Sequence, residues 1–285
     1  MSKRLSSLLA TAGAIAVTGA LVLAGGAGAT GAAGDSLPTL NIALTGTTGV
    51  SVSGSEVSGA VNVVSTFSGK APGGPNSNGP TWGLVRLNPG VTVQQAVAAV
   101  ASRHGDPNAL TGLASLFADN SAGTPTQTVL TPGDYAALNL TGNGNPGIAT
   151  FTVTQSSSPA ALPKPAATQT AIEFNFRGPK VLHNGTLVRA QNGGFLVHMI
   201  IGIGVKNAAT GRAVMALLAA GKDGKAQKLA THNFFNLAGP LSPGGLQQLV
   251  LHAKPGYYVE VCFMDTQDGR EHTRLGMERL IRVVK

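Results

Sequence analysis

The chain has 285 residues, 43% of them hydrophobic, and a formal net charge of +8 at pH 7. This hydrophobic content excludes an intrinsically disordered chain, and the length suffices for one or two domains with an ample core. Aromatic residues make up only 5% of the chain and glycine occupies 39 positions, so turns and aliphatic packing must form most of the structure.

The N-terminal segment, residues 1–29, has the pattern of a signal peptide. Two basic residues precede an apolar run over residues 8–23, and an A-x-A cleavage site ends at Ala29. Cleavage at Ala33 is an alternative, and so is retention of the run as a membrane anchor, because its length is near the lower limit for spanning a bilayer. We expect removal, and therefore a secreted, extracytoplasmic protein with no stable membrane span.

Charge and composition divide the rest of the chain. Residues 30–155 carry 3 basic and 5 acidic side chains, whereas residues 156–285 carry 15 basic and 7 acidic ones. Residues 156–170 are rich in Ser, Pro and Ala and lack an apolar period, which is typical of a linker. We predict a first domain over 30–155, this linker, and a second domain over 171–285. The basic second domain suits an acidic protein partner, whereas an exported chain without a basic–aromatic motif is a poor candidate for binding nucleic acid.

Helical patterns occur early in the first half. Apolar residues recur at helical spacing from residue 92 to residue 103. Asp106 and Pro107 then have the pattern of an N-cap followed by proline at the first helical position, which predicts a second short helix through Ala118. The half is predicted to end in a strand over residues 148–154.

The second half is richer in strand patterns. Ile172, Phe174 and Phe176 alternate with polar residues, which predicts one strand with these three side chains on the same face. A helix is predicted over residues 211–220, where Gly221 stops it. Further strands, punctuated by Asn-Gly, Gly-Gly and Pro-Gly turns, are predicted over residues 187–190, 196–205, 248–252, 257–263 and 278–284.

The two halves contain a related segment: TPGDYAALN at residues 131–139 parallels KPGYYVEVC at residues 254–262. Several short strands with such turns favour β-sandwiches. We predict a mainly β chain of two Greek-key β-sandwich domains, each with a small helical insertion. Asn139 stands in the first copy where the second has Cys262, and Trp82 lies near the position of His198, so the first half is predicted to lack metal ligands.

Cys262 is the single cysteine and cannot form an intramolecular disulfide. A free thiol outside the cell is open to oxidation, so a metal-bound thiolate is one reason to keep it; a buried, inert cysteine on a strand is the alternative. His272 and Met277 follow at C-x9-H-x4-M spacing, and His198 begins an apolar stretch after a glycine-rich turn. One thiolate, two imidazoles and a thioether are the ligand set of a type 1, or blue, copper site.

At these residues the second half resembles the cupredoxin family, the fold type of plastocyanin and azurin. Residues 192–198 are similar to the N-x5-H region of that family, and residues 255–277 to its C-terminal copper loop. The resemblance covers residues 172–284 and is weak over the first half. It implies one copper ion per chain with three equatorial ligands and one axial ligand: His198, Cys262 and His272, and Met277.

The chain departs from the family at the copper loop. Nine residues separate Cys262 from His272, which is longer than in small electron carriers and closer to the copper nitrite reductases. The other second-half histidines, His183, His232 and His252, match no ligand spacing and are expected to be structural or on the surface, with His252 as the one substitute for His198.

These residues predict a secreted type 1 copper protein that carries single electrons. Arg270, Arg274 and Arg279 flank the loop ligands and are predicted to form a basic rim for an acidic redox partner; an ordinary solvated surface is the alternative. A non-redox cupredoxin-like binding or structural module at the cell surface, with copper absent or only stored, is a second interpretation. A copper enzyme of the nitrite-reductase kind needs a second copper, and the first half offers only His104, so we expect no such activity.

Overall fold

The structure is a computed structural model that describes residues 37–71, 79–142 and 145–285. The predicted signal peptide, residues 1–29, lies outside these residues. Within the described part of the chain, no helix combines the length and the apolar character needed to cross a membrane.

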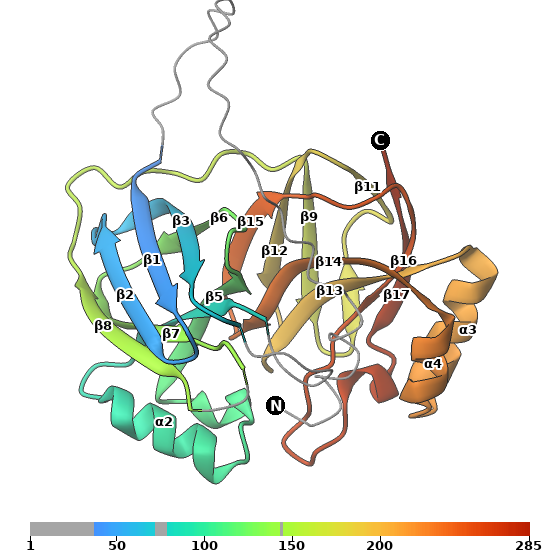
Figure 1. Cartoon of the computed structure of the whole chain (residues 1–285), viewed down its shortest axis with the longest axis horizontal. Coiled ribbons are helices and arrows are strands. Elements are labelled where there is room, and N and C mark those ends of the chain that lie inside the picture. The colour runs from blue at the N-terminus through green and yellow to red at the C-terminus, as the bar shows by residue number, and fades with distance from the viewer. Residues whose placement is uncertain (1–36, 72–78, 143–144) are drawn as a thin grey trace, which may run out of the picture.

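The first half of the chain forms two β-sheets that face each other (Figure 1). Its strands are β1 Thr39–Thr45, β2 Gly49–Gly54, β3 Gly59–Ser68, β4 Thr81–Leu87, β5 Ala114–Ser121, β6 Thr126–Leu130, β7 Gly133–Asn139 and β8 Gly147–Val153. One sheet has the order β2-β1-β3-β6 and the other β5-β4-β7-β8. Side chains of both sheets, Leu40 and Ile42 from one and Trp82 and Tyr135 from the other, meet in a buried core.

The second half repeats this arrangement. Its strands are β9 Ala167–Ile172, β10 Asn175–Arg177, β11 Val181–His183, β12 Leu187–Asn192, β13 His198–Val205, β14 Ala230–Leu241, β15 Leu246–Val250, β16 Gly256–Val261 and β17 Glu278–Val284. One sheet has the order β10-β9-β12-β15 and the other β11-β17-β16-β13-β14. The predicted mainly β, sandwich-like fold is confirmed.

The two halves share one sheet, because β15 pairs with β6 and joins two four-stranded sheets into one of eight strands. The junction consists of a single register pair, Gln248 with Gln127. Beside it the fully buried Gln247 accepts a hydrogen bond from the Asp119 amide at 3.0 Å and donates to the carbonyls of Asp119 and Leu237. Buried polar groups of both halves are thereby satisfied by each other, which fixes their relative position.

The predicted linker is bonded along its length. The Ala60 amide donates to the Ala160 carbonyl at 2.8 Å, and Gln248 donates to the Pro163 carbonyl at 3.1 Å. Strand β9 begins at Ala167, so it takes up the last four residues of the predicted linker. The division into two domains stays a prediction.

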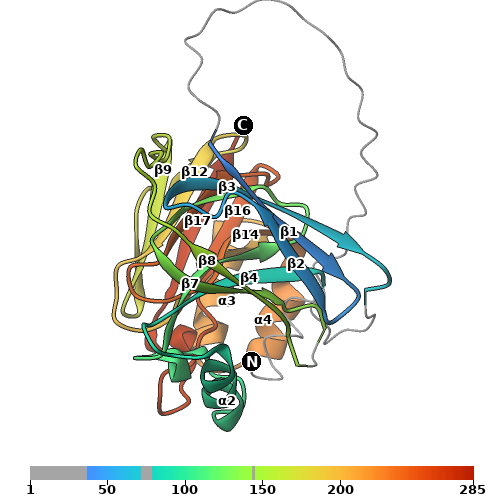
Figure 2. The same cartoon turned by 90° about the vertical axis from the view of Figure 1, so that its left-hand side faces the viewer.

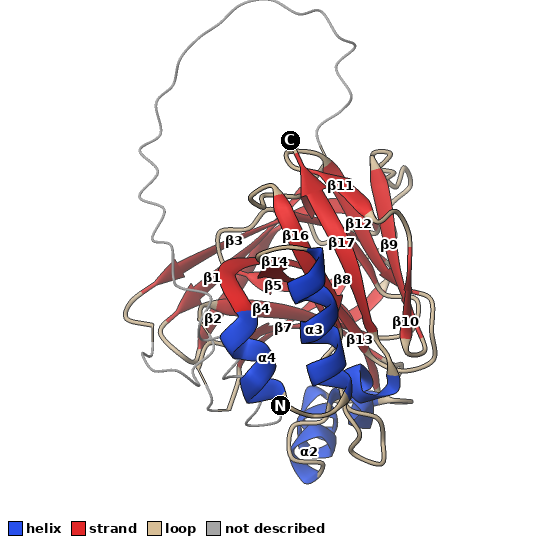
Figure 3. Ribbon diagram, turned by 90° about the vertical axis from the view of Figure 1, so that its right-hand side faces the viewer, coloured by secondary structure: helices blue, strands red, loops and turns tan. Residues whose placement is uncertain are grey.

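Each half carries a helical insertion, as predicted. In the first half, α2 spans Val93–Ser102 and is capped by Thr92, whose side chain and that of Gln95 each accept the other residue's amide (Figure 2). In the second half, α3 spans Ala208–Ala219 and packs against α4, Asp223–Leu229, which was not predicted (Figure 3). Helix α3 also contacts β16 and β17, and thus the strands on either side of the segment from Cys262 to Met277.

The prediction of a helix from Asp106 through Ala118 is wrong beyond its first turn. Asp106 caps a 3-10 helix, η1, as predicted, but η1 ends after Pro107–Leu110. Gly112, at φ +78°, turns the chain away, and residues of β5 pair with β4 instead. Pairing with a neighbouring strand decides the structure of β5, and helical spacing alone does not.

The single strand predicted through Ile172, Phe174 and Phe176 is a hairpin. Asn175 pairs back with Ile172, so β9 and β10 are antiparallel, and Phe174 in the turn has φ +55°. Only Phe176 of the three is buried. A non-glycine residue at positive φ is uncommon, so alternation in the sequence could not reveal this turn. The hairpin places Glu173 beside His198, the first residue of β13, and the Phe174 ring edge-on to the His272 ring.

The two related segments make the same local contact. Tyr135 in β7 donates its hydroxyl to the Thr131 carbonyl at 3.1 Å, and Tyr258 in β16 donates to the Lys254 carbonyl at 2.6 Å. Each hydroxyl closes the corner that leads into a central strand, as tyrosine corners of β-sandwiches do. The internal repeat itself stays a prediction.

Asp119 gives the fold a pH dependence. Its side chain is 6% exposed, beside Gly83 and Gly239 of the neighbouring strands, and burial raises its pKa to about 7. Between pH about 4 and about 7 the folded state binds more protons than the unfolded state, so the free energy of unfolding falls as pH rises. We predict that Asp119→Asn removes this loss and raises the free energy of unfolding by about 4 kcal/mol at pH 8, with little gain at pH 4.

Denaturant unfolding of wild type and variant at both pH values measures this effect. Asp134→Asn is the matched control, because Asp134 is exposed on β7. If Asp119→Asn raised the free energy of unfolding equally at pH 4 and pH 8, the prediction would be wrong. Ionisation of the Asp119 carboxyl would then not destabilise the folded state.

Candidate metal centre

Three of the four predicted ligands converge in the second half. The Nδ1 atoms of His198 and His272 lie 3.2 Å apart, and the Cys262 sulfur lies 3.3 Å from His272 Nδ1 and 3.8 Å from His198 Nδ1. These three form the one group of metal-ligating side chains within 4.8 Å of one another in the described residues. Each histidine therefore presents the same ring nitrogen as the other toward the thiol.

The strands place these side chains at one end of a sheet. His198 is the first residue of β13, and Cys262 directly follows β16, the neighbour of β13. His272 begins the short 3-10 helix η2, His272–Leu275. Gly276, at φ +91°, ends η2 and returns the chain through Met277 into β17.

The long interval between Cys262 and His272 is folded as a small hairpin. Asp265 and Glu271 form an antiparallel bridge, and Thr266 accepts the Arg270 amide while its own amide donates to the Arg270 carbonyl at 2.8 Å. The His272 amide then donates to the Met264 carbonyl at 2.8 Å. The extra residues project away as a closed loop, so the longer spacing still returns His272 to the sulfur.

The backbone of Met277 is hydrogen-bonded to two of the three converging residues. Its amide donates to the His272 carbonyl at 3.0 Å, and its carbonyl accepts the Cys262 amide at 3.3 Å. Its side chain is fully buried. These bonds attach Met277 to two of the converging residues, and its role as the axial ligand is a proposal.

Burial sets the protonation of the three side chains. His198 is 1% exposed, and His272 and Cys262 are 0% exposed. Burial, followed by the nearby His198, lowers the pKa of His272 to about 4, and burial also lowers the pKa of His198. Both rings are thus neutral at pH 7, as metal-binding imidazoles must be. Burial raises the pKa of the Cys262 thiol to about 12, so a thiolate here needs a cation beside it.

The backbone supplies a hydrogen bond to the sulfur. The Met199 amide, adjacent to His198, donates to the Cys262 sulfur at 3.4 Å. Such a donor favours negative charge on sulfur, and hydrogen bonding around a copper-bound cysteine tunes the redox potential.

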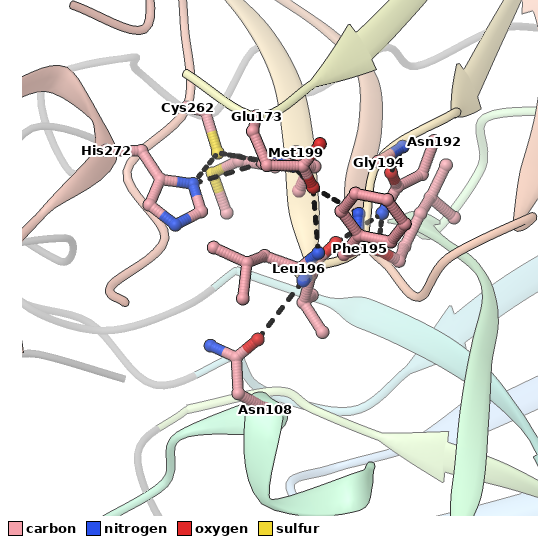
Figure 4. A network of polar contacts seen from close by, with 12 residues as sticks. Asn108, Glu173, Asn192, Gly194, Phe195, Leu196, Met199, Cys262 and His272 are labelled. Atoms are coloured by element: carbon pink, nitrogen blue, oxygen red, sulfur yellow. Dashed lines mark hydrogen bonds and ion pairs between the residues drawn. The ribbon is translucent and has the colours of Figure 1, made fainter. Parts of the chain in front are cut away.

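A carboxylate that the sequence did not reveal lies behind His198. Glu173 Oε1 is 3.6 Å from His198 Nε2 and accepts the amides of Phe195 and Leu196 (Figure 4). Burial raises the pKa of Glu173, but the two amides and the imidazole together lower it by more. The net shift of the pKa is therefore downward. A carboxylate on the outer nitrogen is a common way to fix the orientation of a metal-bound histidine.

Gly194 leaves room for this contact. A Cβ atom at Gly194 would collide with the Glu173 carboxylate and come within 2.9 Å of His198 Nε2. Asn192, at the start of the same turn, donates to the carbonyls of Leu196 and Leu241 at 2.7 Å each. The glycine-rich turn that the sequence marked is therefore needed to bring Glu173 against the imidazole.

The remaining predicted residues lie elsewhere. His252 is exposed on the chain after β15 and is no substitute for His198. In the first half Trp82 and Asn139 are register partners, and the Asn139 amide donates to the Gly46 and Gly49 carbonyls. His104 is exposed near the end of α2.

The basic rim predicted from three arginines is wrong for Arg279. Its side chain is 12% exposed, is paired with the buried Glu260 and donates to the Phe176 and Gly178 carbonyls. Arg274 pairs with Asp223 of α4, whereas Arg270 is 61% exposed and pairs with Asp268. Arg279 is thus a structural residue of the sheet.

No family model matches the sequence, and no curated protein is similar to it. Among solved structures, reduced auracyanin from Roseiflexus castenholzii is 17% identical over 41% of this chain and 95% of its own, with a TM-score of 0.26. A copper nitrite reductase from Nitrosomonas europaea is 12% identical over 86% of this chain and 93% of its own, with a TM-score of 0.23. A multicopper oxidase is 12% identical over 86% and 88%, with a TM-score of 0.25.

These likenesses are too low to support any statement about the site or the activity of this chain. The protein's own His198–Cys262–His272 cluster, in a mainly β fold, is consistent with a cupredoxin-like protein.

Proposed function

We propose that this chain is a secreted type 1 copper protein that carries single electrons. The observation that supports this most directly is the convergence of two imidazole Nδ1 atoms and one thiol sulfur in a buried position. Two neutral imidazoles and a cysteine in a trigonal arrangement, with a weak axial sulfur, are the donor set that type 1 copper prefers. Met277 completes the set as the axial ligand.

The chain's own residues would give such a site its properties. Copper, when bound, takes up and releases one electron between its two common oxidation states. His198, Cys262 and His272 are held by two neighbouring strands and one short helix, so the ligands need move little between states. The Met199 amide and the apolar core around the sulfur adjust the relative stability of those states.

Two further features support an exported electron carrier with a protein partner. Residues 1–29 have the pattern of a signal peptide, and the half that holds the site carries 15 basic against 7 acidic side chains. Phe195 is 87% exposed and stands three residues before His198, which gives a partner an apolar contact near the ligands. We propose an acidic redox protein as that partner, docking on the basic second half.

Complete burial of both imidazole rings favours a second candidate. With exposures of 1% and 0%, neither His198 nor His272 presents an edge to the surface. A non-redox cupredoxin-like binding or structural module fits this burial. In it copper would be absent or only stored, and the three side chains would serve mainly as buried core. Cys262→Ser separates the electron carrier from a module without copper, because it abolishes electron transfer but leaves a binding function unrelated to copper intact.

We predict that the purified protein with added Cu(II) absorbs strongly near roughly 600 nm, the signature of copper–thiolate bonding at a type 1 site. Cys262→Ser is expected to lose this band and His252→Gln to keep it, because His252 is exposed and does not belong to the cluster. Absorption titration with Cu(II) is the measurement. A colourless wild-type protein that binds no stoichiometric copper would contradict this prediction. It would favour the binding or structural module without copper.

We predict that Met277→Leu raises the midpoint potential of the bound copper by about 60 mV or more, a tenfold change for one electron. Loss of the thioether removes a donor that stabilises Cu(II), and leucine fills a similar volume in the core. Protein-film voltammetry measures the potential. Met264→Leu is the matched control, since Met264 is also buried, at 6% exposure; equal potentials in both variants would exclude Met277 as the axial ligand.

A further inference from the structure

The side chain of Asn108, in the first half, hydrogen-bonds to the segments that surround the metal centre. Asn108 lies in η1, the 3-10 helix at Pro107–Leu110, and is 6% exposed. Its side-chain oxygen accepts the Val197 amide at 3.1 Å, and its side-chain nitrogen donates to the Asp265 carbonyl at 2.8 Å. Figure 4 shows Asn108 below the turn that contains Leu196, with its amide pointing toward that turn.

Both partners of Asn108 are neighbours of ligands. Val197 directly precedes His198, and Asp265 lies in the loop that connects Cys262 to His272. One amide therefore bridges the two segments from which all of the converging side chains come.

The orientation of this amide is determined by three contacts. Asp106, the cap of η1, accepts both the Asn108 amide at 2.9 Å and the side-chain nitrogen at 3.0 Å. The nitrogen thus faces two acceptors and the oxygen faces a donor, an arrangement that a flipped amide would reverse at every contact. Asp106 holds Asn108 ready for the bridge.

The Asn108 bridge is buried, so its loss would leave a buried amide without a hydrogen-bond partner. Val197 is 3% exposed, and without Asn108 its amide would lack a partner in the core. Leu110 of η1 packs in the same apolar cluster as Val197 and Met264. Other bonds between the halves, such as the Leu116 amide to Ser242, join strands and touch neither segment that bears the ligands.

We propose that Asn108 is a positioning residue of the metal centre: it holds the two ligand-bearing segments of the second half against each other. The first half, which lacks ligands of its own, thereby forms part of the site. The role toward copper rests on the proposed function, whereas the closure of the two segments around Cys262 can be measured without copper.

The first measurement is the rate at which a small thiol reagent modifies Cys262 in the full-length protein without added metal. Cys262 is the only cysteine and is fully buried, so modification requires the segments to open. We expect Asn108→Ala to raise this rate about tenfold, the factor that about 1.4 kcal/mol represents. Asn88→Ala is the matched control, because Asn88 donates to the Gly112 carbonyl within the first half. Equal rates in wild type and Asn108→Ala overturn the proposal.

Asn108→Asp provides a second variant if the alanine substitution prevents folding. It keeps the acceptor for Val197 and loses the donor to Asp265, so we expect a faster modification with unchanged circular dichroism. Modification at the wild-type rate in folded Asn108→Asp would equally overturn the proposal.

The second measurement is the rate at which copper passes from the loaded protein to a chelator, expected to rise about tenfold in Asn108→Ala and to stay unchanged in Asn88→Ala. Faster thiol modification with unchanged copper loss overturns the positioning role. If wild type binds no copper, the proposed function fails, and the closure by Asn108 is judged by the thiol rate alone.

Discussion

The structure of the second half depends on one constraint: a thiol and two imidazoles must share a site from which water is excluded. Polar groups without partners destabilise an apolar core, and the three donor atoms have chiefly one another. Their separations of 3.2 to 3.8 Å leave each within hydrogen-bonding reach of the others. A cation bound among these three atoms, with loss of the thiol proton, would leave the core closed to water.

Several parts of the fold serve this constraint. The closed hairpin between Asp265 and Glu271 returns His272 to the sulfur, and Gly194 admits Glu173 to the outer face of His198. Asn108 adds a contact from the other half of the chain. The first half, which supplies none of the three converging donor atoms, is therefore tied to the centre by Asn108 as well as by the shared eight-stranded sheet.

Prediction from the sequence was accurate where local chemistry decides the structure. The cap at Asp106, the final strand Glu278–Val284 and the insertion α3 were all predicted, because caps, alternation and turn residues act over a few positions. It failed where a strand partner farther along the chain or an uncommon backbone conformation decides. Pairing with β4 makes a strand of residues expected to be helical, and a tight turn at Phe174 breaks an alternating pattern.

The sequence by itself determined the chemistry of the candidate centre: the identity and order of His198, Cys262, His272 and Met277, and the mainly β fold that holds them. Only the tertiary structure decided their surroundings. Glu173 and Asn108 lie 25 and 90 residues before His198 along the chain, by subtraction of their numbers, and Arg279 turned inward to Glu260. Contacts between residues so far apart leave no local pattern, because they arise from sheet pairing and packing.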